Sequence, residues 1–291
     1  MSLLLFSSAF YLDVEQRQAV QKRVSTMNSF LGSSEKDIER QMYVSSYRIL
    51  VLLEKRIIDS KNYIPATDFN PLFNEAFFNG TLNSQKQDLM IGATFYEFIN
   101  VTNENAKKMN LNLAITNPII NITQEDPWHV AVILKANLVM QDNSNLASWN
   151  KTLIIKSYIP IESFEDPVYL LNTGGQVPNK FIETPYTFSS TNIANLSLHL
   201  QNMYYINTTE SPSFLDRLKG NISSSSPYGV ESLVDINKLP SDVYIMATGS
   251  KSVVDHIYFS NQNPTPLCIV PGMPSWFRID KQHAAYYNIA C

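Results

Sequence analysis

The sequence of 291 residues has few charged residues and few glycines, and each shortage excludes a class of protein. Charged residues make up 16% of the chain, against about 25% in typical soluble domains. The net charge of -4 provides no basic field for phosphates, so we expect no binding to nucleic acid. The nine glycines form no Gly-x-Ser-x-Gly, phosphate-loop or dinucleotide-binding pattern, which gives no support for an enzyme built on glycine-rich loops.

Cysteine and histidine are also scarce. The two cysteines, Cys268 and Cys291, are too few for a zinc knuckle. They are either two buried thiols or one disulfide that ties the C-terminal residue to an upstream strand, and an oxidising compartment favours the disulfide. The four histidines form no His-x-x-x-His pair. The sequence alone therefore assigns no catalytic, cofactor-binding or metal-binding residue, and we expect no cofactor.

Uncharged polar residues, chiefly Asn, Ser and Thr, supply the polarity that charges do not. Low charge combined with this composition fits a surface or secreted protein, and we expect a glycoprotein. About four acceptor sequences of the form Asn-x-Ser/Thr would arise by chance for so short a pattern, so the excess found here is modest. The seven acceptor asparagines are Asn79, Asn100, Asn121, Asn150, Asn195, Asn207 and Asn221.

The chain has an uncharged stretch near its N-terminus, Leu3 to Leu12, which leads directly into an amphipathic segment, Asp13 to Val24. A secretory signal would begin with basic residues, yet the first one here is Arg17. A complete transmembrane helix needs about 20 apolar residues. We therefore interpret residues 1–12 as the outer end of a membrane anchor that continues upstream, which predicts a membrane partner through the N-terminal helix. The alternative is the buried first helix of an ordinary domain.

Residues 1–110 have the apolar spacing of helices. Apolar side chains three and four residues apart predict one helix up to about residue 31 and a second over 34–60. The short connection through Gly32 favours an antiparallel helical hairpin, and one kinked continuous helix is the alternative. Two further helices are predicted. One begins at Pro71 and ends before residue 80, and the other is capped by Ser84 and reaches about residue 108.

At residue 111 the apolar period changes to two, as in strands. Strands are predicted over 111–122, 128–140 and 152–159, in an antiparallel meander packed on the helices. Regularity falls after residue 173, and strands return over 243–246, 253–259, 267–270 and 276–279. The predicted fold class is α+β, with an N-terminal helical hairpin and further helices packed on an antiparallel β-sheet. It divides into a helical region (1–110), a β-meander (111–173) and an irregular, strand-rich C-terminal part (174–291).

The best grouping of chemically reactive side chains lies in the C-terminal part, where Asp255 precedes His256 and Asp280 lies three residues before His283. Two carboxylates and two imidazoles can bind a divalent metal or orient a general base. The ordinary interpretation is that they are solvated polar groups at strand ends and turns. Convergence of the four side chains in a cleft would favour an enzyme, and scattering over the surface would exclude one.

The order of elements resembles that of type IV pilin-like proteins, in the helix from Leu3 to Val24 and the sheet from Leu111 to Ile159. Two segments, 164–169 and 228–233, also look like stretches in large archaeal membrane-anchored surface proteins. The resemblance implies an apolar helix in a membrane or filament core, an outward-facing globular part, and no cofactor.

The functional expectation is thus an extracytoplasmic, membrane-anchored, pilin-like structural or adhesive protein of the cell surface. It would assemble with itself or contact other surface proteins. The alternative from a different class is an extracytoplasmic hydrolase or metal-dependent enzyme that uses Asp255, His256, Asp280 and His283.

Overall fold

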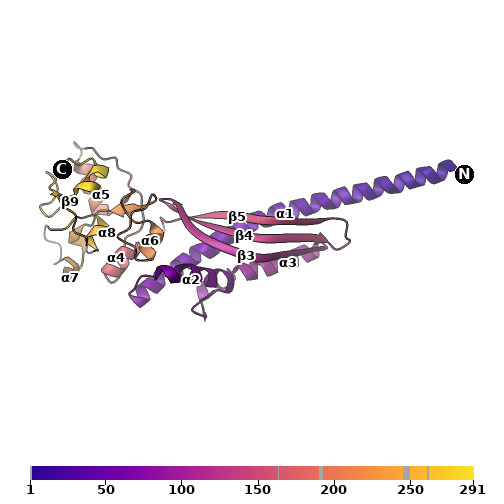
Figure 1. Cartoon of the computed structure of the whole chain (residues 1–291), viewed down its shortest axis with the longest axis horizontal. Coiled ribbons are helices and arrows are strands. Elements are labelled where there is room, and N and C mark those ends of the chain that lie inside the picture. Colours follow the sequence, from indigo (N-terminus) through magenta and orange to yellow (C-terminus); the bar gives the residue numbers. More distant parts are fainter. Residues whose placement is uncertain (1, 163, 190–192, 245–249, 261) are drawn as a thin grey trace. The chain divides into compact units, whose positions relative to one another are not determined.

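The computed structural model describes residues 2–162, 164–189, 193–244, 250–260 and 262–291, and their side chains from residue 14 onward except 242 and 244. The chain is α+β, which confirms the predicted fold class (Figure 1). It divides into two compact units that cut across the ranges 1–110, 111–173 and 174–291. Unit 1 comprises Met1–Tyr47, Asn74–Asn121 and Val132–Ser157, and unit 2 comprises Arg48–Phe73, Ile122–Ala131 and Tyr158–Cys291.

One continuous helix, α1 (Ser2–Ser60), stands where a helical hairpin was predicted. Gly32 lies inside this helix, and Ser33 Oγ donates a hydrogen bond of 2.9 Å to the carbonyl of Phe30. A glycine within a helix costs about 1 kcal/mol relative to alanine. Full burial of Met27, Ile38 and Met42 along α1 contributes about 1.5–3 kcal/mol each. Packing therefore outweighs the local break, and the continuous helix holds in place of the hairpin.

The predicted membrane partner requires a correction. Among the described residues, no helix has both the length and the apolar character needed to cross a membrane.

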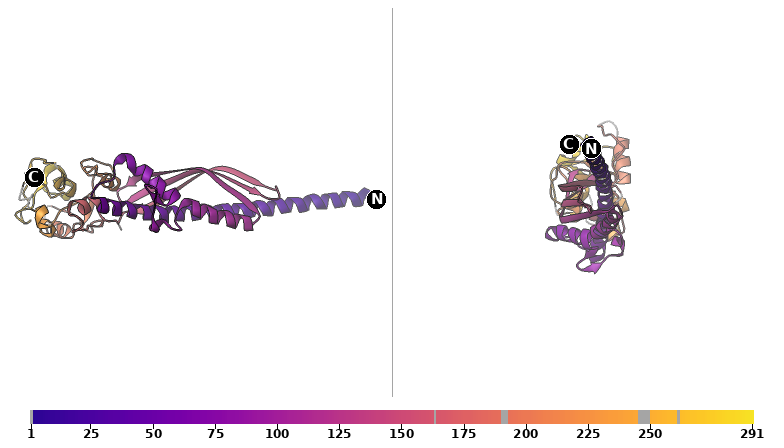
Figure 2. Two further views of the ribbon diagram at one scale, coloured as in Figure 1. Left: turned by 90° about the horizontal axis from the view of Figure 1, so that it is seen from below. Right: turned by 90° about the vertical axis from the view of Figure 1, so that its right-hand side faces the viewer.

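The sheet of three strands in unit 1 confirms the predicted meander, with the strand order β3-β4-β5 (Figures 1 and 2). Its strands are β3 (Leu111–Asp126), β4 (His129–Asp142) and β5 (Ser148–Pro160). Buried and exposed side chains alternate from Leu134 to Asp142, as expected for a strand with one face covered. The end of β3 from Ile122, the start of β4 up to Ala131 and the end of β5 from Tyr158 belong to unit 2.

Helix α3 (Phe95–Lys108) begins later than predicted because Thr94, and not Ser84, is its cap. Thr94 Oγ1 accepts a hydrogen bond from the Glu97 amide at 3.2 Å, and the Glu97 carboxylate accepts one from the Thr94 amide at 3.1 Å. The residues before it form a small hairpin and a 3-10 turn, β1 (Thr81–Leu82), β2 (Gln85–Lys86) and η1 (Asp88–Met90).

Helices α1 and α3 run antiparallel within unit 1, as two contacts show. Ser45 Oγ of α1 donates to the carbonyl of Ala93, just before α3, at 2.5 Å. Arg23, about six turns closer to the start of α1, donates from Nη2 to the carbonyls of Met109 and Asn110, both at 2.8 Å. Helix α2 (Ala66–Asn79) starts before Pro71, so the prediction of proline at its first position is wrong, whereas Gly80 does follow its end.

Unit 2 consists of short helices and short strand pairs, in which β6 pairs with β7 and β8 with β9, both antiparallel. The predicted strand over 253–259 is instead a helical turn, and part of the one over 243–246 lies outside the described residues. The elements are α4 (Pro167–Asn172), α5 (Ile193–Asn202), β6 (Tyr205–Asn207), α6 (Phe214–Leu218), β7 (Val230–Ser232), η2 (Ile236–Lys238), α7 (Ser241–Tyr244), α8 (Asp255–Tyr258), β8 (Leu267–Cys268), β9 (Ile279–Asp280), α9 (Lys281–Ala284) and η4 (Ala285–Tyr287).

A buried ion network holds several of these elements together. Arg217 of α6 is fully buried and donates from Nη1 to Asp166 at 2.6 Å and to Asp255 at 3.0 Å. Burial opposes the charge of the guanidinium, but the two carboxylates outweigh it and raise the pKa of Arg217. Asp255 also accepts from the amide and hydroxyl of Ser232, at 3.1 and 2.9 Å. The network therefore fixes α8 against β7.

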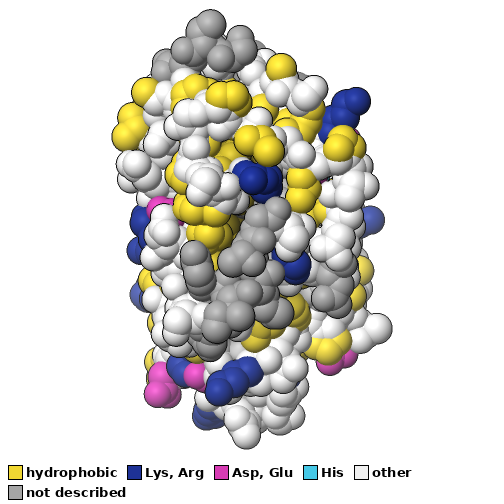
Figure 3. Space-filling model, turned by 90° about the vertical axis from the view of Figure 1, so that its left-hand side faces the viewer, with side chains coloured by type: hydrophobic (Ala, Val, Ile, Leu, Met, Phe, Trp, Pro, Cys, Tyr) yellow, Lys and Arg dark blue, Asp and Glu magenta, His cyan; other side chains and the backbone are white. Residues whose placement is uncertain are grey.

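The face drawn in Figure 3 has mostly uncharged and apolar side chains, with a few scattered charged ones, and no described histidine is visible on it. This agrees with the low charged fraction of 16%.

Candidate metal centre

Three buried side chains from separate elements of unit 2 converge: Glu231 of β7, His256 of α8 and His283 of α9. Each offers one carboxylate oxygen or imidazole nitrogen, and these three atoms lie within 4.8 Å of one another. The residues are 0%, 2% and 4% exposed. We call them the histidine–glutamate cluster.

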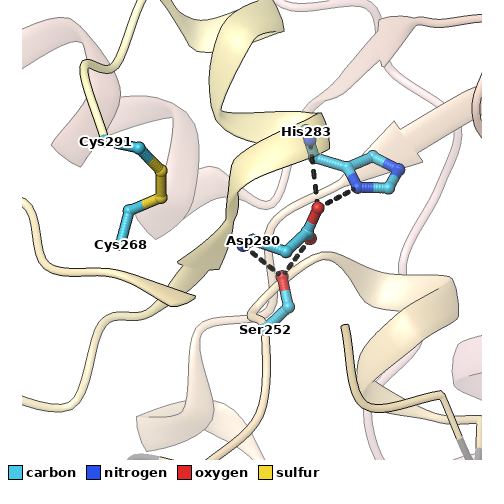
Figure 4. Close-up of a disulfide and its surroundings, with 5 residues drawn as sticks. All are labelled: Ser252, Cys268, Asp280, His283 and Cys291. Carbon is cyan, nitrogen blue, oxygen red and sulfur yellow. Dashed lines mark hydrogen bonds and ion pairs between the residues drawn. A yellow bond between two sulfur atoms is a disulfide. The ribbon is translucent and has the colours of Figure 1, made fainter. Parts of the chain in front are cut away.

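Asp280 orients the imidazole of His283. It is the N-terminal cap of α9, and its Oδ1 lies 2.7 Å from Nδ1 of His283 (Figure 4). Its other oxygen accepts from Ser252 Oγ at 2.8 Å. Although burial acts in the opposite direction, the hydrogen bond and charge of His283 lower the pKa of Asp280, so this carboxylate is ionised and accepts. Nδ1 of His283 therefore carries a proton.

The second ring nitrogen of His283 points away from Asp280 (Figure 4). It lies 3.5 Å from Oε2 of Glu231 and has no hydrogen-bond partner of normal geometry among the described residues.

A backbone carbonyl orients His256 in the same way. Nδ1 of His256 lies 3.2 Å from the carbonyl oxygen of Ile222, which can only accept, so Nδ1 carries the proton. Burial lowers the pKa of His256 to about 4, and the ring is neutral near pH 7. Its Nε2 therefore has a free lone pair. The hydroxyl oxygen of Ser211 lies 3.2 Å from that nitrogen.

Ser211 supplies one proton for two acceptors, the His256 nitrogen and Oε2 of Glu231, and its hydroxyl donates to the latter at 2.5 Å.

The position of Ser211 in the chain depends on Gly229, immediately before β7. A Cβ atom on Gly229 would lie 2.1 Å from the carbonyl oxygen of Ser211 and 2.5 Å from that of Thr208. Only glycine lets this part of the chain pass so close to Ser211.

The electrostatics of the cluster follow from burial. Burial raises the pKa of Glu231 to about 7, against the opposing effects of His283 and Ser211. Burial alone would lower the pKa of His283, but the Asp280 hydrogen bond and the charge of Glu231 raise it. The hydroxyl of Tyr287 faces Glu231 without a hydrogen bond of normal geometry, and burial followed by this carboxylate raises its pKa.

One distance in the cluster, between His283 and Glu231, has the length that a tetrahedral metal ion requires. Two imidazole nitrogens and a carboxylate oxygen are common zinc ligands, and two ligands about 2.1 Å from zinc are about 3.4 Å apart in a tetrahedron. The 3.5 Å between His283 Nε2 and Glu231 Oε2 fits this separation. Metal-binding histidines characteristically donate their other nitrogen to a carboxylate or a backbone carbonyl. Asp280 and Ile222 provide these two acceptors.

The same residues do not form a nucleophilic triad. In such a triad the serine and the carboxylate contact opposite nitrogens of one histidine. Ser211 contacts His256, whose other nitrogen faces a backbone carbonyl, and Ser252 contacts Asp280 rather than a histidine. Both hydroxyls are fully buried.

Of the four predicted site residues, His256 and His283 come together, Asp280 orients one of them, and Asp255 turns to Arg217. His256, His283 and Asp280 lie close together in the protein interior and not in an open cleft. Sequence reasoning missed Glu231. The available signal was a carboxylate enclosed by the apolar residues of segment 230–236.

Cys268 and Cys291 form a disulfide in the structure, with their Cα atoms 5.1 Å apart (Figure 4). Among the acceptor asparagines, Asn195 is half-buried and donates from Nδ2 to the carbonyl of Thr187 at 2.8 Å. The other six are exposed: Asn79, Asn100, Asn121, Asn150, Asn207 and Asn221.

No protein-family model, no curated protein and no solved structure matches this chain. The resemblance to type IV pilin-like proteins therefore stays a prediction from the order of the elements.

Proposed function

We propose that this chain is a metal-binding protein, in which Glu231, His256 and His283 hold one divalent transition-metal ion, with zinc the best fit. One observation carries the proposal. Two histidine lone pairs, each directed by a fixed Nδ1–H partner, face a single buried carboxylate. Two buried atoms of the cluster, Nε2 of His283 and Oε1 of Glu231, have no hydrogen-bond partner of normal geometry among the described residues. Leaving a buried acceptor without a partner costs about 1–3 kcal/mol, and a cation would satisfy these two groups while also binding His256.

Burial supports a structural role for the ion. A catalytic zinc site keeps one position open to water or substrate, whereas none of the three ligands is more than 4% exposed. The ion would join β7, α8 and α9, which come from distant parts of the sequence. Its binding free energy would then stabilise unit 2 directly.

The test is metal stoichiometry combined with thermal unfolding. After removal of metal and titration with zinc, we expect about one ion per chain by mass spectrometry of the metal. At a free zinc concentration 100 times Kd, the unfolding free energy should rise by about 2.7 kcal/mol. His283→Gln should lose both effects. His129→Gln is the matched control, because His129 is half-exposed and lies outside the cluster.

A wild-type protein that binds less than a tenth of an equivalent would contradict the proposal. So would His283→Gln binding as tightly as wild type. In the first case a proton shared between Glu231 and His283 would be the occupant of the cluster, and in the second the ion would lie elsewhere.

The second candidate, compatible with the first, is an extracytoplasmic structural or adhesive protein of the cell surface. The disulfide supports this proposal, because disulfides persist in oxidising compartments. The six exposed acceptor asparagines support it too. Intact-mass measurement of protein from its natural host should show two fewer hydrogens than the reduced chain, plus glycan mass. Free thiols and an unmodified mass would contradict the extracytoplasmic location.

A further inference from the structure

We infer that the Cys268–Cys291 disulfide controls how tightly the histidine–glutamate cluster holds its ion. The oxidised chain retains the ion, and reduction loosens it. This inference rests on the proposed metal site and adds a redox dependence to it.

The disulfide closes a ring that contains one metal ligand and the residue that orients it. Cys268 of β8 is paired with Ile279 of β9, and Asp280 follows at the end of that strand. Helix α9 comes next and carries His283, and the chain then returns to Cys268 through Cys291. Figure 4 shows the disulfide, Asp280 and His283 in the same region of the fold. His283 is therefore covalently fixed to β8 from both sides.

Without the disulfide, two exposed hydrogen bonds connect the end of this segment to other parts of unit 2. Tyr286 Oη lies 2.9 Å from Thr209 Oγ1, and Asn288 Nδ2 donates to the carbonyl of Phe188 at 2.7 Å. Exposed hydrogen bonds of this kind exchange readily with water and contribute little net stability. Buried packing of Ala284 and Tyr287 remains. The reduced segment would thus hold His283 less rigidly without unfolding outright.

The other two ligands lie outside the ring. Glu231 is on β7 and His256 on α8, and Asp255 joins these two elements through its bonds to Ser232 and Arg217. Reduction would leave them in place. The ion would keep two ligands and lose the fixed position of the third, so affinity should fall by roughly 10–100-fold, as when the orientation of a ligand is disturbed.

The chemical step is a two-electron reduction. In a cell a dithiol attacks one sulfur, the S–S bond breaks, Cys268 and Cys291 each take up one proton as thiols, and the dithiol becomes a disulfide. Rebinding of the ion by the new thiols would complicate the outcome. A variant with serines at both positions separates the two effects.

The experiment compares zinc affinity of the oxidised wild type with that of the double variant Cys268→Ser/Cys291→Ser, by competition with a chromophoric chelator. We expect an increase in Kd of at least tenfold in the double variant, with near-ultraviolet circular dichroism unchanged. Equal affinity within twofold would overturn the inference while leaving the metal site intact. A wild type that binds no zinc would instead overturn the proposed function.

A second measurement tests the redox dependence of zinc binding if the double variant does not fold. Zinc release from the wild type to the chelator is followed before and after reduction by a water-soluble phosphine, which becomes the phosphine oxide as water supplies the oxygen. We expect release at least tenfold faster after reduction. An unchanged release rate in protein shown by mass to be reduced would overturn the inference.

Discussion

Replacing Glu54 by glutamine should make the stability of unit 2 less dependent on pH. Glu54 lies on α1 within unit 2 and is 8% exposed. Burial raises the pKa of its carboxyl from 4.5 to about 9. The charges of Glu165 and Asp166 contribute to this increase in pKa, and the Glu165 amide and Lys180 oppose it. The carboxyl is therefore protonated and neutral in the folded protein near pH 7.

The direction in which stability changes with pH follows from the linkage between proton binding at Glu54 and folding. Because the folded pKa lies above the unfolded value, the proton stabilises the fold fully below pH 4.5, and this contribution is lost as pH rises towards 9. A difference of about 4.5 pKa units corresponds to roughly 6 kcal/mol as an upper limit. Glutamine resembles the protonated acid in shape and carries no titrating proton, so Glu54→Gln should remove this dependence.

Urea denaturation at pH 5, 7 and 9, followed by tryptophan fluorescence, measures the effect. Wild type and Glu54→Gln should have similar unfolding free energies at pH 5, and the variant should be more stable by several kcal/mol at pH 9. Asp59→Asn is the control, because Asp59 is exposed on the same helix in the same unit and forms only a surface ion pair with Lys55. Equal pH slopes for wild type and Glu54→Gln would refute the reasoning.

Three further substitutions test other parts of the structure. Arg217→Met leaves Asp166 and Asp255 buried without a positive partner, and urea denaturation should show a loss of about 3–5 kcal/mol; a loss below 1 kcal/mol would contradict the buried network. Thr94→Ala removes the cap of α3, which should cost about 1 kcal/mol in thermal unfolding, and an unchanged midpoint would argue against the cap. Asp280→Asn weakens the acceptor that orients the ligand imidazole, and zinc affinity should fall about 10–100-fold in chelator competition. Unchanged affinity would show that Asp280 has no such role.

The sheet was predictable because its signal is local. Alternating apolar residues from Leu111 to Ile159 require only neighbouring residues to indicate a strand, and short links limit the topology to a meander. The same reasoning failed at Gly32, where burial on either side outweighs a local helix break. It also passed over Thr94 with Glu97, although this pair has the spacing of a capping box.

The candidate site could be predicted only in part, because its geometry depends on contacts between distant residues. His256 and His283 were singled out through aspartates one and three residues before them, yet Asp255 binds Arg217. Glu231 lies 25 residues before His256, with no motif to connect them. A pair of residues can be recognised from spacing within one element, whereas convergence of three elements depends on tertiary structure.

The division of unit 2 has a consequence during synthesis. Its first segment, Arg48–Phe73, leaves the ribosome roughly 85 residues before the start of its main segment, Tyr158–Cys291. At about 5–20 residues per second, this delay amounts to about 4–17 s. During that time Ile64, which is buried in the finished protein and donates its amide hydrogen bond to the carbonyl of Leu218 at 3.1 Å, lacks this partner. The first segment of unit 2 therefore cannot complete its contacts, and stays open to chaperones, until the C-terminal half has been made.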